Sequence, residues 1–395
     1  MSFVFILFVI ALAPLAWAAW RRPSGGRPVW ILAMVGSELA PWFLGVLVLS
    51  AAGFIVAGWV GGTVGRLGLV AAAPEAMAFV IAITRSRGVT EAAASSVSNF
   101  LGTPVSLPAV RLRSLVPPRS SGAGLHVDPS LTYGPHPRHL VDRIKSVDLR
   151  QPAPAIIHLH GGGWWRGSRH RQGLPLLHHL ARNGWVAFTP SYRLSPEATF
   201  PDHLVDVKRL VVWIRANALE LGVDPSFIAI AGGSAGGQLA ALAALTGRER
   251  SLQPGFEEGD ASVQACIPFY GVHDLVDEAG GPLWPYLVDQ VMKSEPNVAP
   301  VAWHQASPTR MATADRPPFF VVHGSADTLV DPGMSRDLVA ALRAVGGPGV
   351  GHLEVPWANH GFDYFRSLRS LPVVHGVTAA LVAMRDWARV EGGLD

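Results

Sequence analysis

The two stretches that decide the fold are His160-Gly161-Gly162-Gly163-Trp164 and Gly232-Gly233-Ser234-Ala235-Gly236. Each follows a short apolar run typical of a buried strand, residues 155–159 before the first and 227–231 before the second. The second stretch has the G-x-S-x-G pattern of a turn that lifts a serine above a sheet. The first can direct backbone N–H groups toward a developing oxyanion. Together they indicate a site for acyl transfer.

From residue 131 onward, short apolar segments alternate with longer amphipathic ones. This alternation predicts a largely parallel sheet with helices on both faces. The expected strands are 144–149, 155–159, 185–189, 227–231, 263–269, 319–323 and 352–355. The expected helices are 167–182, 201–221, 235–245, 332–345 and 372–390. Ligands of such sheets bind outside the carboxyl ends of the strands, and both glycine stretches follow strand ends.

A serine hydroxyl needs a histidine base and an acid that orients the histidine. In α/β hydrolases these groups follow the serine in the order acid, then histidine. Asp327 follows the predicted strand 319–323, and His360 follows 352–355. Asp331 is an alternative acid, although it precedes Pro332 and is also suited to capping the next helix. Ser234, Asp327 and His360 are therefore the expected catalytic residues.

The expected oxyanion donors are the backbone N–H groups of Gly162, Gly163 and Ala235. We expect His160 to order the first glycine loop through hydrogen bonds rather than to act as a base. A metal site at His273-Asp274 would have an incomplete set of ligands. No metal and no cofactor is expected.

The N-terminal part is unusually apolar. No residue from 2 to 20 or from 39 to 65 is charged, and between Arg66 and Arg85 the only charge is Glu75. Because about 20 apolar residues cross a bilayer core, we expect three spans at roughly 2–20, 38–60 and 64–84. Residues 29–37 either extend the second span or lie at the interface. The third span is the weakest, because Pro74-Glu75 interrupts it.

Arginines predict the orientation of these spans. Arg21, Arg22 and Arg27 follow the first span, and Arg85 and Arg87 follow the third. Both clusters are cytoplasmic under the positive-inside rule if three spans place the N-terminus outside. The expected protein is then a multi-pass protein of the inner or plasma membrane with a cytoplasmic catalytic domain. If the third segment is a surface helix instead, that domain faces outward.

The overall composition excludes some classes of partner. The 395 residues include 32 basic and 29 acidic ones, a balance that gives no reason to expect a nucleic-acid partner. The single cysteine, Cys266, excludes a disulfide within the chain, and its apolar setting predicts a buried side chain.

The motifs resemble those of a known family. They are HGGGW at 160–164, SYRLSPEATFPDHLVDV at 191–207, AGGSAGG at 231–237, HGSADTLV at 323–330 and NHGF at 359–362, and they are similar to those of α/β-hydrolase esterases and lipases of the hormone-sensitive-lipase-like group. The high usage of Ala, Gly, Arg and Trp, together with a membrane segment, also resembles actinobacterial lipase-like esterases. Tyr133-Gly134-Pro135 also resembles the feruloyl-esterase-like and kynurenine-formamidase-like branch, in which a strand hairpin precedes the HGG loop. The resemblance covers residues 131 to 395.

This resemblance implies hydrolysis of carboxylic esters through a serine acyl-enzyme, with a small-molecule ester of short to medium acyl length or a lipid-derived ester as substrate. It also implies a cap, expected at 88–130 and 278–306. The expected organisation is a transmembrane segment at 1–87, a linker or cap at 88–130 and an α/β-hydrolase domain at 131–395. An aryl-formamide or amide hydrolase is the nearest alternative, and an inactive membrane-tethered binding module is a further one.

Overall fold

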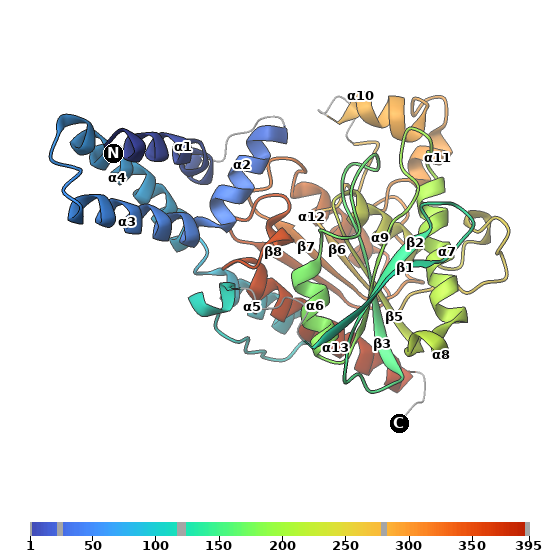
Figure 1. The fold of residues 1–395 in the computed structure, drawn as a ribbon. Coiled ribbons are helices and arrows are strands. Elements are labelled where there is room, and N and C mark those ends of the chain that lie inside the picture. The colour runs from blue at the N-terminus through green and yellow to red at the C-terminus, as the bar shows by residue number, and fades with distance from the viewer. Residues whose placement is uncertain (1, 22–26, 117–123, 278–282, 392–395) are drawn as a thin grey trace.

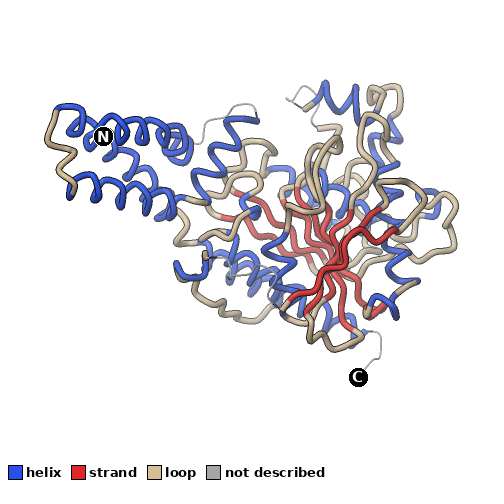
Figure 2. Tube along the Cα trace, in the orientation of Figure 1, coloured by secondary structure: helices blue, strands red, loops and turns tan. Residues whose placement is uncertain are grey.

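The computed structural model describes residues 2–21, 27–116, 124–277 and 283–391. Its centre is an eight-stranded sheet with the order β1-β2-β4-β3-β5-β6-β7-β8 (Figures 1 and 2). β2 pairs antiparallel with β1 and with β4, and the remaining neighbours are parallel. The strands are β1 (Leu125–Thr132), β2 (Leu140–Ser146), β3 (Ala153–Leu159), β4 (Val186–Pro190), β5 (Val223–Gly233), β6 (Ala265–Phe269), β7 (Phe319–Gly324) and β8 (Val350–Val355). The expected mostly parallel sheet is confirmed.

Alternating side chains of the central strands build two cores, one on each face of the sheet. In β3, Ile157 packs on one face and Ile156 on the other, and both are fully buried. Successive side chains of a strand point to opposite faces, so a continuous apolar run suits a strand that is covered on both sides.

Helices cover both faces. The Ile156 face packs against α5 (Val89–Leu101), α6 (Leu174–Arg182) and α13 (Ser370–Glu391). The Ile157 face packs against α7 (Asp202–Ala216), α9 (Ala235–Leu245) and α12 (Gly333–Ala344). Shorter elements are the helices α8 (Ala218–Leu221), α10 (Trp284–Tyr286) and α11 (Pro300–Gln305), 3-10 turns at Leu112–Leu115, Arg250–Leu252 and Phe362–Tyr364, and a π-helical turn at Leu287–Met292.

The N-terminal helices are α1 (Ser2–Arg21), α2 (Arg27–Glu38), α3 (Ala40–Val56) and α4 (Thr63–Thr84). α1, α3 and α4 form a bundle that projects from the side of the hydrolase fold, and α2 lies between this bundle and the hydrolase fold (Figure 1). Aromatic pairs join the bundle helices, such as Phe43 with Phe79 at 5.6 Å between ring centroids. Two helical stretches in the described residues, Ser2–Arg21 and Thr63–Leu101, are long and apolar enough to cross a membrane. α2 and α3 make a third candidate only as a pair bent by 73°.

Two parts of the range 88–130, expected as a linker or cap, belong to the fold itself, and residues 117–123 lie outside the described residues. The first part is α5, whose Val89, Ala93 and Val97 are fully buried against the sheet and α13, and the second is most of β1. The three apolar residues repeat every fourth position, which places them on one helix face. α5 is therefore part of the hydrophobic core.

Three further expectations change in detail. β2 begins at Leu140 rather than at Ile144, because its first residues pair with β1 and β4. Pro74 does not interrupt α4, which continues through it. In the expected cap 278–306, residues 278–282 lie outside the described residues, and the rest forms α10, the π-helical turn and α11.

Candidate active site

Ser234 lies on the sharp turn between β5 and α9. Its backbone angles, φ 58° and ψ −123°, are unfavourable for a residue with a side chain. The turn is held because the Ser234 N–H donates to the carbonyl of Phe269 at 2.9 Å. A Cβ on Gly232 would lie 2.3 Å from the Gly236 oxygen, and one on Gly236 would lie 2.2 Å from the Leu159 oxygen. Glycine at both positions therefore permits the turn.

The first glycine loop follows β3 and lies directly beside Ser234. A Cβ added to Gly161 would be 2.7 Å from the Gly233 oxygen and 3.0 Å from the Ser234 Cβ. The Gly161 N–H donates to Gln172 Oε1 at 2.6 Å, whereas the backbone hydrogen bonds between described loop residues leave the N–H groups of Gly162 and Gly163 unused. Ala235 opens α9, where the first N–H groups have no partner within the helix. The three expected donors thus lie on the two loops that meet at Ser234.

His160 is fixed at the start of the first glycine loop by stacking and hydrogen bonds. Its ring stacks on Tyr192 with 4.4 Å between centroids, and the Tyr192 hydroxyl donates to the His160 carbonyl at 2.8 Å. His160 Nδ1 lies 3.0 Å from the Gly161 oxygen. Burial lowers the pKa of His160 to about 4, so the ring is neutral at pH 7. This arrangement agrees with an ordering function for His160.

His360 and Asp327 meet at the ends of β8 and β7. His360 Nδ1 lies 2.7 Å from Asp327 Oδ2, and both side chains are buried. Asp327 Oδ1 accepts the N–H groups of Leu329 and Val330 at 2.8 and 2.9 Å. Burial alone would raise the pKa of Asp327, but the charges and hydrogen bonds of His360 and His323 outweigh it and hold the pKa well below its usual range. The carboxylate is therefore ionised and fixed against His360.

Asp331, the alternative acid, occupies a different environment. It is exposed, and its Oδ1 accepts the N–H of Gly333 at 2.6 Å where α12 begins. Asp274, next to the buried His273, pairs with Arg310 at 2.9 Å. Within the described ranges, no group of three or more His, Cys, Asp or Glu side chains is arranged to hold a metal ion.

Three residues beside the acid and base do not follow from the sequence motifs. His323 Nε2 lies 3.2 Å from Asp327 Oδ2, and its Nδ1 lies 2.6 Å from Ser335 Oγ. The Tyr270 ring packs 4.5 Å from the His360 ring, and its hydroxyl donates to Asp363 Oδ1. Burial raises the pKa of Asp363 to about 6. The only sequence signal was position, since His323 and Tyr270 lie at or just after strand ends.

A cavity of about 810 Å³ has Ser234, His360, Gly162 and Gly163 in its lining. The structure thus brings the expected nucleophile, base and two of the oxyanion donors to one cavity. Tyr286 from the expected cap also lines it, and its hydroxyl donates to the Gly163 carbonyl. Trp164 and Trp165 line the cavity as well, although Trp164 is buried and Trp165 is exposed.

The N-terminal helix α2 also lines this cavity, which the sequence did not predict. Its contribution consists of Trp30, Ile31, Met34 and Val35. Trp30 Nε1 donates to the carbonyl of His360 at 2.7 Å. One wall of the candidate active site therefore comes from outside the hydrolase domain.

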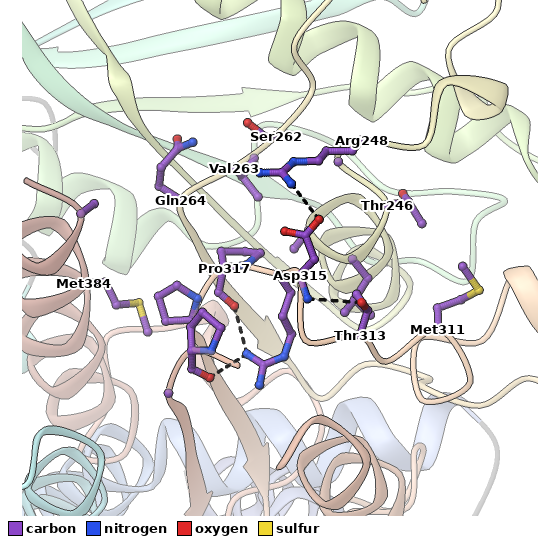
Figure 3. A pocket seen from close by; sticks show the side chains of 18 of the residues that line it. Thr246, Arg248, Ser262, Val263, Gln264, Met311, Thr313, Asp315, Pro317 and Met384 are labelled. Atoms are coloured by element: carbon purple, nitrogen blue, oxygen red, sulfur yellow. Dashed lines mark hydrogen bonds and ion pairs between the residues drawn. The ribbon is translucent and has the colours of Figure 1, made fainter. Parts of the chain in front are cut away.

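Figure 3 shows a second cavity, of about 720 Å³. Its lining includes residues just before β6 and β7, at the opposite end of the sheet strands from Ser234. Asp315 there pairs with Arg248 at 2.8 Å. Arg316 donates to backbone carbonyls, including those of Leu342 and Gly346 at 3.0 and 3.1 Å near the end of α12. Asp315, Arg248 and Arg316 thus have partners within the protein, which is a structural role.

A model of the BD-FAE family matches residues 144–342, half of the sequence. The chain belongs to the BD-FAE family. The matched range contains both glycine loops and Asp327, and it ends before His360. Membership confirms the resemblance to α/β-hydrolase esterases that the motifs indicated.

Curated relatives and a solved structure agree with this family. The probable carboxylic ester hydrolase LipM of Mycobacterium tuberculosis is 43% identical over 249 residues, covering 62% of this chain and 58% of LipM. Esterase LipQ of the same organism is 41% identical over 253 residues, covering 63% and 60%. The thermophilic esterase Est2 of Thermogutta terrifontis has a TM-score of 0.54 at 27% identity, covering 70% of this chain and 95% of Est2. The chain spans about three fifths of the length of the curated relatives it matches.

Proposed function

We propose that this BD-FAE protein is a serine hydrolase of carboxylic esters. The observation that carries the proposal is the His360–Asp327 contact of 2.7 Å at a cavity that Ser234 also lines from a strained turn. Nucleophilic acyl transfer requires a serine nucleophile, a histidine base and an ionised acid that orients the histidine. The relatives named as esterases support the same reaction class.

In the proposed reaction, Ser234 Oγ attacks the ester carbonyl and its proton passes to His360 Nε2. The N–H groups of Gly162, Gly163 and Ala235 stabilise the oxyanion. The tetrahedral intermediate collapses as the C–O bond to the alcohol breaks, and His360 gives its proton to the departing alcohol. Water then attacks the acyl-enzyme and gives its proton to His360. The bond between Ser234 Oγ and the acyl carbon breaks, His360 returns the proton to Ser234 Oγ, and the carboxylic acid leaves. Asp327 holds His360 in the orientation and tautomer that both steps need.

Labelling with a fluorophosphonate tests the proposed nucleophile, because the probe reacts only with an activated serine. We expect labelling of the native protein and none of the Ser234→Ala variant. Turnover of acetyl esters and of aryl-formamides then distinguishes the two hydrolase reactions. Formamide turnover far above ester turnover would identify an amide hydrolase, and absence of labelling in both proteins would indicate an inactive binding module.

We also propose that the chain is a multi-pass membrane protein whose hydrolase domain faces the cytoplasm. At one end of the bundle, the Ser2 hydroxyl donates to the Trp59 carbonyl. At the other end, Arg85 donates to the Trp20 carbonyl at 3.0 Å, so the ends of α1 and α4 that carry arginines meet beside the hydrolase. Positive residues at one end favour the cytoplasmic side. α1, with 20 residues, is about 30 Å long, which matches a bilayer core.

Thiol labelling of the full chain tests this orientation. Leu219 is 95% exposed on the hydrolase domain, whereas the native Cys266 is fully buried. A membrane-impermeant maleimide should therefore label a Leu219→Cys variant in broken cells and leave the native chain unlabelled. Labelling of Leu219→Cys in intact cells would overturn the cytoplasmic assignment.

A further inference from the structure

α2 differs from the other N-terminal helices because it leaves the bundle and contacts the catalytic loops. The chain bends by 73° between α2 and α3, where Pro41 occupies the first turn of α3. The first turn of a helix suits proline, because the missing N–H has no partner within the helix there, and α2 and α3 form two segments rather than one straight span. The bend places α2 between the bundle and the hydrolase domain (Figure 1).

α2 packs directly on the loop of the candidate base. Trp30 donates to the His360 carbonyl at 2.7 Å, and its ring meets the His360 ring edge-on at 5.8 Å between centroids. The next residue, Gly361, has φ +73°, and a Cβ there would lie 3.1 Å from Met34 Sδ and 3.3 Å from the Trp30 ring. The glycine therefore permits the close approach of α2 to His360.

A buried ion pair fixes the end of α2. Glu38 Oε1 lies 3.2 Å from Arg369 Nη1, and the Ser367 hydroxyl donates to Glu38 Oε2 at 2.6 Å. Arg369 also donates to the carbonyl of Ala82 in α4 at 2.9 Å. Both charged side chains are at most 2% exposed. Because such a pair is stable only with its partners in place, α2 is held as a fixed wall of the cavity.

The cavity lining combines apolar and polar parts. The α2 part is apolar and includes Ile31, Met34 and Val35, and further apolar residues such as Leu329 and Val330 come from other segments. The segment after the first glycine loop contributes polar residues, Arg166 and Arg171. An occupant with an apolar chain and a polar end matches this lining.

The loop of the candidate base also lies at the end of the membrane bundle. Trp357, three residues before His360, is 47% exposed, and the Arg85 guanidinium lies 4.4 Å from its ring centroid. Arg85 directly follows α4, and exposed tryptophan beside arginine is typical of the membrane–water interface. The α2 wall therefore lies between the catalytic loop and the apolar bundle.

We propose that α2 forms the acyl-chain wall of the active site, so that the substrates are long-chain acyl esters drawn from the bilayer. This inference rests on the proposed ester hydrolysis. The acyl chain lies along Ile31, Met34 and Val35, and the ester carbonyl lies at Ser234. The alcohol end faces the polar segment with Arg166 and Arg171.

The experiment uses the full chain in phosphatidylcholine nanodiscs and compares kcat/KM for p-nitrophenyl butyrate and laurate. A native chain with the proposed wall favours laurate, because each methylene removed from water is worth about fourfold in binding. Val35→Trp fills the wall. If it excludes about three methylenes, the laurate-to-butyrate ratio falls about 60-fold. Val46→Trp, on the exposed face of α3, is the matched control and keeps the native ratio.

Ile31→Glu provides a second variant, at a position that is 38% exposed, and we expect a fall in the ratio there as well. Fluorophosphonate labelling of each variant verifies an intact Ser234. A native preference for butyrate, or labelled variants that keep the native ratio, would overturn the acyl wall while leaving ester hydrolysis intact. If the native chain hydrolyses neither ester, the proposed function itself is overturned.

Discussion

Replacing Asp327 with asparagine tests the most specific contact of the site. Asp327 Oδ1 accepts two backbone N–H groups, and Oδ2 faces His360 Nδ1 at 2.7 Å. An asparagine retains one acceptor oxygen, which the two N–H donors hold on their side. Its NH2 group then faces His360 and favours the tautomer with an unprotonated Nδ1. In that tautomer Nε2 carries the proton and is unable to accept one from Ser234.

The expected loss follows from this change of tautomer. An asparagine at the acid position of a Ser-His-Asp triad lowers kcat by about 10⁴-fold, which corresponds to about 5.5 kcal/mol in the activation free energy. KM should change little, because Asp327 is buried behind His360 rather than exposed to substrate. Asp331→Asn should keep kcat within about threefold, since an exposed surface substitution that preserves a hydrogen-bond acceptor has a small effect.

The assay is steady-state hydrolysis of p-nitrophenyl acetate by both variants and the native chain in the same nanodiscs. Circular dichroism and the thermal midpoint confirm that each variant is folded. An Asp327→Asn kcat within tenfold of native would refute the assignment. A larger loss in Asp331→Asn than in Asp327→Asn would move the acid to Asp331.

Three further outcomes are expected. Gly162→Ala puts a Cβ 2.0 Å from the Arg166 oxygen at a φ of +125°, so kcat should fall about 10²–10³-fold; near-native turnover would exclude this loop from the oxyanion site. Glu38→Ala leaves Arg369 buried without its charge partner and should lower the free energy of unfolding in detergent by about 3–5 kcal/mol; an additional Arg369→Met should recover part of this loss, and no recovery would contradict the coupling. Burial raises the pKa of Asp363 to about 6, so the folded state binds this proton more tightly. The contribution of this proton to the free energy of unfolding, up to about 3 kcal/mol, is fully present below about pH 4 and is lost as the pH rises through 6. Asp363→Asn should remove that dependence from thermal midpoints measured across this range, and an unchanged profile would contradict it.

Elements with strong local signals were predictable from the sequence. The continuous apolar runs of β3 and β5 require burial on both faces, and the glycines around Ser234 are needed for one specific turn. The candidate acid and base followed from chain order, since parallel strands bring their carboxyl ends to the same edge. Asp327 and His360, 33 residues apart, are in contact for that reason.

Features that depend on packing between distant segments were not predictable. α5 was predicted as part of a connector because alanine and serine make up much of it, and its stripe of Val89, Ala93 and Val97 contains few large apolar side chains. The contacts of Tyr270 with His360 and Asp363 join loops after different strands, and no spacing in the sequence encodes them. Trp30 lies in an apolar stretch that hydropathy assigns to the membrane, and only the bend after α2 directs it to His360.

The position of α2 changes how the expected boundary at residue 87 is understood. Without residues 1–87, the His360 carbonyl would lose the Trp30 donor, Gly361 would lose its contact with Met34, and Arg369 would lose the carboxylate of Glu38. The first two losses affect the loop of the candidate base, and the third leaves a charge buried and unpaired. If residues 1–87 served only as a tether, another membrane anchor could replace them without these losses. The N-terminal helices therefore belong to the same energetic unit as the site, and α2 links the bundle to His360.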